Sequence, residues 1–237
     1  MKRCRLKIKE TCMTIIAEEQ FIPVAVKEIN KQRFLLEEYI KNNPVFKASL
    51  LPCRVRPDAP DIVRRMAEAG KKVGVGPMAA VAGAIAEYTA RAMVGAGARH
   101  IIVDNGGDIA LYIDHPVTVG IYTGHAKISD LGLRLEPRGK IFGICTSSGS
   151  IGHSLNLGIS DAAVVIADDV LLADAVATSV GNRLDKKEKK SVQTALEQFM
   201  FQKINGIIAV IDDIMGICGD IPHIVELKPN RNIDCQR

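Results

Sequence analysis

Asp174 and Thr178 offer the clearest chemistry in this chain, because a carboxylate and a hydroxyl four residues apart share one face of a helix. They present two hard oxygen ligands, which suit Mg2+ better than zinc. The residues around Asp174 are small or apolar, so we expect this face to be buried. A buried carboxylate needs a compensating partner, which is either a metal ion or an ordinary backbone N–H or arginine.

A loop rich in hydroxyl groups precedes this helix. It contains Cys145, Thr146, Ser147, Ser148 and Gly149, and His153 follows four residues later. Such a loop is suited to holding a phosphate or another polar ligand. As an alternative, Cys145 or a serine could act with His153 as a nucleophile and base for acyl transfer. No G-x-S-x-G elbow supports that alternative.

Two glycine-containing segments could contact a ligand. Gly76 and Pro77 precede a helix, whose unpaired N–H groups attract phosphate, although a plain turn explains them equally well. The segment 104–108, DNGGD, predicts a hairpin turn centred on Asn105 and Gly106. Its second glycine and two carboxylates exceed what a turn needs, and glycine pairs often mark a close approach to the backbone. Whether the carboxylates contact a ligand or only shape the turn stays open.

Composition limits the classes of protein. With 237 residues, 47% of them hydrophobic, the chain is long enough for a large core, and we expect one domain over residues 1–237. The net charge of +4 comes partly from lysines and arginines at residues 2–9. Because no aromatic ladder accompanies them, they indicate a charged edge strand, and we expect no nucleic-acid partner.

Cysteine spacing and the apolar segments indicate a cytoplasmic protein with no membrane association. The six cysteines form no C-x-x-C pair, which disfavours a zinc or thioredoxin motif and fits reduced intracellular thiols. The long apolar run 73–98 contains Glu87 and Arg91, which are spaced to pair on the exposed face of a soluble helix. A membrane span is therefore not expected there.

Hydrophobic periodicity and turn residues place the secondary structure. Strands are expected at 4–9, 12–18, 100–104, 109–113 and 117–122, once or twice within 131–145, and at 162–167, 207–211, 214–218 and 223–227. Helices are expected at 23–43, 61–69, 78–94, from the N-cap residues Asp168 and Asp169 to about 182, and at 191–203. The proline-rich stretch 44–60 is expected to be irregular. Without regular βαβ alternation, this order favours an α+β fold with largely antiparallel sheets packed against helices.

The segments GPMAAVAGAIAEYTARAM, VDNGGDIALYI, VTVGIYT, CTSSGSIGHS and VVIADDVLLADAVATSVGN lie within about residues 74–182. On these segments the chain resembles the ApbE-type FAD:protein FMN transferase superfamily. The resemblance implies an ApbE-like fold in which Asp174 and Thr178 bind Mg2+. It also implies that Gly106, Gly107 and Asp108 line a cofactor cleft beside residues 146–149, and it suggests His153 as a base.

The activity implied is transfer of FMN from FAD to a threonine of an acceptor protein, or hydrolysis of FAD to FMN and AMP. The partners would be a flavin or other dinucleotide and a separate acceptor protein, and self-association stays open. After His153 the chain reads SLNLG, where the superfamily has an Asp-Pro segment. The amino-terminal third also lacks the Met-Gly-Thr and Ser-Arg-Phe segments of the superfamily. A non-catalytic ligand-binding or assembly protein that keeps the fold is therefore the alternative.

Overall fold

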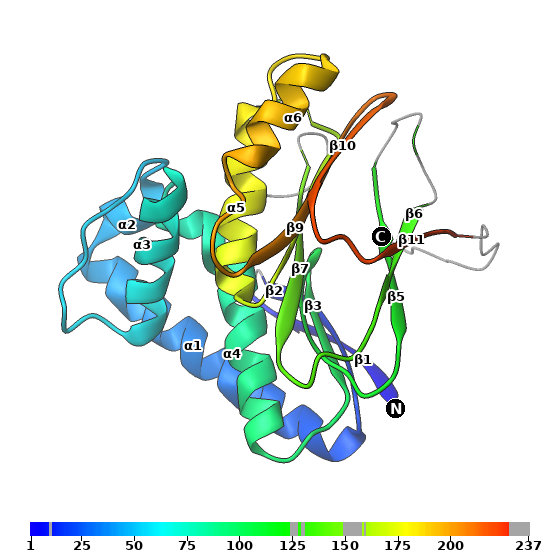
Figure 1. Ribbon diagram of the computed structural model, residues 1–237. Helices are drawn as coiled ribbons and strands as arrows, with labels where there is room; N and C mark the ends of the chain where they lie inside the picture. The colour runs from blue at the N-terminus through cyan, green and yellow to red at the C-terminus, as the bar shows by residue number, and fades with distance from the viewer. Residues whose placement is uncertain (10, 124–127, 129–130, 149–157, 159, 228–237) are drawn as a thin grey trace.

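Helices cover one face of a large antiparallel sheet, and a smaller sheet covers the other face (Figure 1). The computed structural model describes residues 1–227 apart from residues 10, 124–127, 129–130, 149–157 and 159. Every strand pairing within this part of the chain is antiparallel. The α+β class and the antiparallel sheets predicted from the sequence are thus confirmed.

The large sheet has eight strands in the order β1-β2-β3-β4-β7-β8-β9-β10, and the small sheet has the order β11-β6-β5. The strands are β1 (Lys2–Ile8), β2 (Thr11–Ala17), β3 (Ile101–Asn105), β4 (Asp108–Tyr112), β5 (Val117–Ile121), β6 (Leu131–Leu135), β7 (Phe142–Ser147), β8 (Ala162–Ala167), β9 (Ile204–Ile211), β10 (Ile214–Gly219) and β11 (His223–Glu226). The basic residues near the N-terminus lie on β1, an edge strand, as the charge pattern predicted.

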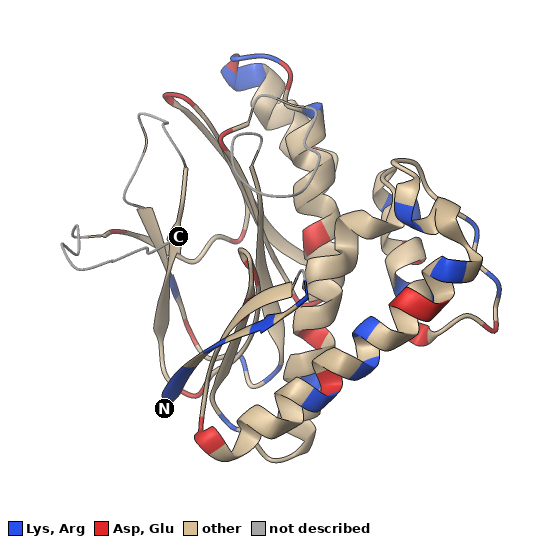
Figure 2. Cartoon of the chain, turned by 180° about the vertical axis from the view of Figure 1, so that it is seen from behind, with Lys and Arg blue, Asp and Glu red and all other residues tan. Residues whose placement is uncertain are grey.

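The helices are α1 (Ile22–Asn42), α2 (Pro44–Ala48), α3 (Asp61–Val73), α4 (Val81–Gly95), α5 (Val170–Arg183) and α6 (Lys189–Glu197), with short 3-10 turns η1 (Glu19–Phe21) and η2 (Pro77–Ala80). Acidic and basic residues both occur along α1 and α3 (Figure 2), as expected for helices with one face in contact with water. Within the described residues, no helix combines the length and apolarity that crossing a membrane requires.

Strand β8 shows how the layers are built, since all six of its residues are buried. Successive side chains of a strand point to opposite faces. Ala163, Val165 and Ala167 accordingly join the core under the helices, while Ala162, Val164 and Ile166 join the core between the two sheets. The central strand is therefore apolar throughout, unlike the half-exposed edge strand β1.

Three local predictions are wrong. The stretch 44–60 is not irregular throughout, because Pro44 opens helix α2, where a missing N–H costs nothing. Glu87 does pair with Arg91, but its side chain is only 1% exposed and does not lie on an outer face. The β3–β4 turn consists of Gly106 and Gly107, with φ of 72° and 101°, while Asn105 ends the strand opposite Asp108.

Candidate functional site

Asp174 lies in the contact between helices α4 and α5. The backbone N–H of Gly83 donates a hydrogen bond to its Oδ2 over 2.8 Å. A Cβ placed on Gly83 would stand 2.8 Å both from Asp174 Cβ and from the carbonyl oxygen of Val170, too close for any side chain. Glycine at this position therefore lets the two helices approach until the carboxylate meets the α4 backbone.

The β3–β4 turn lies beside the start of α4. Asn105 Nδ2 donates to the carbonyl oxygen of Ala82 over 3.1 Å, which ties the turn to the helix one residue before Gly83. The N–H of Gly107 donates to Asp104 Oδ1 over 2.9 Å. Both glycines need positive φ, which explains the pair without a ligand. That they also line a cofactor cleft stays a prediction.

Asp108, the first residue of β4, has a carboxylate that the described part of the chain compensates only in part, through hydrogen bonds with the Cys145 thiol and the Thr146 N–H. Its Oδ1 is buried and has no hydrogen-bond partner there. Burial raises the pKa of Asp108 well above the usual value, and the nearby charges of Asp174 and Asp104 raise it further. Burial likewise raises the pKa of Asp174 to about 7, although hydrogen bonds from Gly83 and Ala82 oppose that shift. Two carboxyl groups from different elements thus share one buried region.

The end of β7 forms the neighbouring wall. Cys145 pairs with Asp108 across the strands, and a Cβ on Gly107 would lie 3.9 Å from Thr146 Cβ. Ser147 is buried and Ser148 is half-buried. Of the predicted hydroxyl-rich segment, Thr146 is thus the residue placed beside the Gly-Gly turn, and a shared ligand site stays a prediction. Gly149 and His153 lie outside the described residues.

Cys145 does not have the properties of a nucleophile. It is fully buried, and its Sγ donates to the carbonyl oxygen of Val170 over 3.4 Å. Burial raises the pKa of its thiol well above the usual value, and the charges of Asp108 and Asp174 add to the effect. A thiol held protonated is a poor nucleophile, which argues against acyl transfer through this cysteine.

Thr178 and Gly76 have different surroundings. Thr178 is buried one turn after Asp174 on α5, on the face that the four-residue spacing predicted. At Gly76, a Cβ would fall 1.9 Å from the carbonyl oxygen of Ser49, so the glycine is needed for packing against the chain after α2. That contact favours the structural interpretation of Gly76, and a ligand contact there stays a prediction.

The donor groups around Asp174 fit a divalent cation. The unpartnered Oδ1 of Asp108 and the carboxylate of Asp174 are hard oxygen donors, and Thr178 adds a hydroxyl one helical turn away. Neighbouring carboxylates repel each other when both are ionised, and a cation between them removes that repulsion. These residues are the ones that would hold Mg2+.

The sequence did not indicate the buried role of Glu87, which lies in the adjacent part of the α4–α5 contact. Its carboxylate accepts hydrogen bonds from the N–H groups of Val170 (2.9 Å) and Leu171 (3.1 Å). Arg65 and Arg91 donate to its other oxygen over 2.7 and 2.8 Å. With the predicted N-cap residue Asp169 accepting from Leu172, the first turn of α5 is satisfied by the protein itself. An anion is therefore not expected at this helix end.

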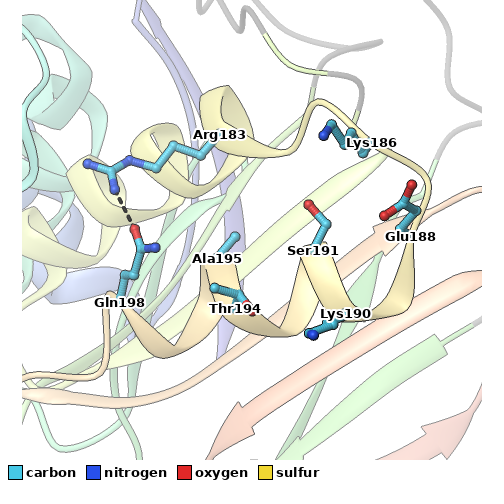
Figure 3. A pocket seen from close by; sticks show the side chains of 8 residues that line it. All are labelled: Arg183, Lys186, Glu188, Lys190, Ser191, Thr194, Ala195 and Gln198. Carbon is cyan, nitrogen blue, oxygen red and sulfur yellow. Dashed lines mark hydrogen bonds between the residues drawn. The ribbon is translucent and has the colours of Figure 1, made fainter.

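A pocket of about 450 Å3 lies away from these residues, between the end of α5 and α6 (Figure 3). Its lining is Arg183, Lys186, Glu188, Lys190, Ser191, Thr194, Ala195 and Gln198. Arg183 is held there by a 2.7 Å hydrogen bond to Gln198. The pocket includes none of the predicted site residues, so it plays no part in the site described above.

Comparison with known proteins agrees with this architecture. The family described as "AbpE bacteria" matches residues 1–200. The UPF0280 protein of Methanocella arvoryzae is 47% identical over 225 residues, covering 94% of this chain and 91% of the relative. The UPF0280 protein of Methanococcoides burtonii is 46% identical and covers 92% of both chains.

Two solved structures share the fold at low sequence identity. The ApbE protein from Thermotoga maritima is 10% identical, with a TM-score of 0.56, covering 96% of this chain and 97% of that one. The apo flavinyl transferase ApbE from Pseudomonas stutzeri is 12% identical, with a TM-score of 0.52, covering 92% and 94%. At these identities the likeness establishes the fold alone. The chain belongs to the AbpE bacteria family, is related to the UPF0280 proteins, and has an ApbE-like fold.

Proposed function

We propose that this protein binds the pyrophosphate of FAD, or of a related dinucleotide, through a Mg2+ ion held by Asp108, Asp174 and Thr178. The observation that carries the proposal is the buried Oδ1 of Asp108, which has no partner among the described residues although Asp174 lies close enough to raise its pKa. A folded protein rarely leaves such an atom uncompensated unless a ligand completes the site.

The surrounding residues supply the rest of a dinucleotide site. Thr146 lies beside Gly107 near the end of β7, and Ser147 and Ser148 follow it with two further hydroxyl groups. Hydroxyl and backbone N–H groups are suited to phosphate oxygens. Mg2+ bound here would neutralise charge on the pyrophosphate as its P–O–P bond breaks.

The chemistry we propose is FMN transfer. The hydroxyl of an acceptor threonine attacks the phosphorus of the FMN half, AMP leaves, and FMN stays attached through a phosphoester. Water in place of threonine gives FMN and AMP. The solved neighbour named a flavinyl transferase supports this reaction class by fold, and His153 is our candidate for the base that takes the hydroxyl proton.

The first test is calorimetric titration of the purified chain with FAD, with and without Mg2+. Asp174→Asn keeps an oxygen to accept from Gly83 but removes the charge, and should weaken Mg2+-dependent FAD binding by about 100-fold. Asp185→Asn, at an exposed aspartate beyond α5, is the matched control and should bind like the parent.

Release of AMP is then measured with and without candidate threonine-containing acceptors. AMP formation that needs both Mg2+ and Asp174 supports the transferase or hydrolase activity. Magnesium-dependent binding with no AMP under any condition would instead favour the non-catalytic alternative. No FAD binding in either condition would refute the flavin proposal.

A further inference from the structure

A second donor cluster lies at the opposite end of the β3–β4 hairpin from the Gly106–Gly107 turn. It consists of His100, Asp114 and His115, whose ligand atoms all lie within 4.8 Å of one another. His100 directly precedes β3, while Asp114 and His115 follow β4. The strand register, which pairs Ile101 with Tyr112, brings the two ends of the hairpin together.

Both histidines direct the same ring nitrogen at one carboxylate oxygen. Nδ1 of His100 lies 2.7 Å from Asp114 Oδ1, and Nδ1 of His115 lies 2.6 Å from the same atom. The two rings are stacked, with centroids 4.0 Å apart and planes 12° from parallel. Two imidazoles converging on one carboxylate form a donor set of two nitrogens and one oxygen, with both nitrogens on the same side.

We propose that His100, Asp114 and His115 form a binding site for a divalent transition-metal ion such as Zn2+, separate from the magnesium site. Imidazole and carboxylate are the usual ligands of zinc outside thiolate sites, and three protein ligands leave a fourth position for water or another ligand. Mg2+, which prefers an all-oxygen octahedral shell, does not suit this set. The two sites thus select different ions by ligand type.

Burial gives the three residues different parts in such a site. The His100 side chain is only 9% exposed, whereas those of Asp114 and His115 are 57% and 62% exposed. His100 is therefore a fixed ligand, and the other two lie where an ion arrives from solution. Zinc bonds of about 2.0–2.2 Å place tetrahedral ligand atoms roughly 3.3 Å apart, so Asp114 and His115 have to move outward when the ion binds. The exposed His115 ring also has to turn out of its stack on His100, because a nitrogen lone pair lies in the plane of its ring and two parallel rings cannot both point at one ion.

The position of the cluster makes its effects separable from the first site. Asp114 lies six residues after Asp108, which at about 3.3 Å per strand residue puts the two regions roughly 15–20 Å apart. Metal at the histidine cluster would clamp the open end of the hairpin without touching the residues proposed for FAD. The inference stands whether or not the flavin proposal holds.

The experiment is calorimetric titration of the full chain with Zn2+ in excess Mg2+, together with the absorption spectrum of the Co2+-substituted protein. One equivalent of Zn2+ should bind. His115→Ala and Asp114→Asn, both at exposed positions, should each weaken binding by about 100-fold or more, since even outer-shell changes cost 10–100-fold. His223→Ala, at an exposed histidine of β11, is the matched control and should leave affinity unchanged.

Circular dichroism checks that each variant is folded, and parent-like FAD titrations show that the first site is intact. Unchanged zinc affinity in both His115→Ala and Asp114→Asn would overturn the proposal, as would an equal loss in His223→Ala. A thiolate charge-transfer band in the cobalt spectrum would place the ion on cysteine and would also overturn it.

Discussion

Glu87 on α4 and Asp174 on α5 are both buried in the α4–α5 contact, but their charges are compensated to different degrees. Glu87 accepts from two arginines and two backbone N–H groups, so its charge is fully compensated. Asp174, four residues beyond Val170 on α5, has backbone donors only, and its neighbour Asp108 carries a partnerless oxygen in the described structure.

The difference separates a carboxylate whose charge the fold itself neutralises from one whose charge it does not. Burying an ion is tolerated when paired charges and hydrogen bonds replace water. Around Glu87 the chain supplies these groups itself, through Arg65 on α3 and the start of α5. In the described part of the chain, no lysine or arginine forms an ion pair with Asp174 or Asp108. Their charge is therefore removed either by protonation, as the raised pKa values indicate, or by the cation proposed above.

The largest effect should follow from breaking the compensated site. Glu87→Ala leaves Arg65 and the N–H groups of Val170 and Leu171 without their acceptor, and should lower the free energy of unfolding by about 3–5 kcal/mol. Urea denaturation of the parent and variant measures the change. Glu68→Ala, at an exposed glutamate of α3, should stay within about 0.5 kcal/mol of the parent. A loss below about 1 kcal/mol for Glu87→Ala would mean that its hydrogen bonds and ion pairs do not stabilise the fold.

The sequence predicted the uncompensated carboxylate better than the compensated one. Apolar neighbours were enough to place Asp174 on a buried face, and the glycine pair and hydroxyl loop indicated what lies around it. Glu87 was misplaced because a Glu–Arg pair four residues apart is typical of exposed helix faces. One of its partners, the N–H of Val170, lies 83 residues further along the chain, and no local sequence pattern predicts such a contact.

The β3–β4 turn and Gly83 also depend on contacts that no local sequence pattern predicts. Asn105-Gly106 and Gly106-Gly107 are both acceptable two-residue turns, and only the pairing of Asn105 with Asp108 decides between them. Gly83 belongs to an alanine-rich helix, where nothing in the sequence distinguishes it from a residue packed on the sheet. Its role becomes visible only once α5 is placed against it.

Removing the charge of Asp174 should raise the free energy of unfolding, whereas removing Glu87 should lower it. Burial raises the pKa of Asp174 to about 7, so between about pH 4 and pH 7 the folded chain holds a proton that the unfolded chain has lost. Stability therefore falls as pH rises through this window and stays low above it. In metal-free buffer at pH 8, Asp174→Asn should be more stable than the parent by about 2–4 kcal/mol, with a gain less than half as large at pH 5.

Urea denaturation at both pH values, with a chelator present, measures this gain. Added Mg2+ should then stabilise the parent but not Asp174→Asn, which narrows the difference between them. An unchanged or lower stability of the variant at pH 8 would mean that the carboxylate is compensated within the chain. In that case Asp174 and Glu87 would belong to one class of buried structural acids.

The smallest effect comes from the glycine that lets Asp174 reach the α4 backbone. Gly83→Ala puts a methyl group 2.8 Å from Asp174 Cβ and from the Val170 carbonyl oxygen, so α4 and α5 must separate, at a cost of about 1–3 kcal/mol. Gly95→Ala, at the end of the same helix with open space around it, should instead stabilise by about 0.5–1 kcal/mol. Thermal unfolding of both variants tests the contrast. Because the separation also shifts Asp174 relative to Asp108 on β4, Gly83→Ala should weaken Mg2+ binding, whereas Gly95→Ala should leave it unchanged. Equal Mg2+ affinity in the two variants would mean that the close helix contact serves packing alone and does not position the carboxylates.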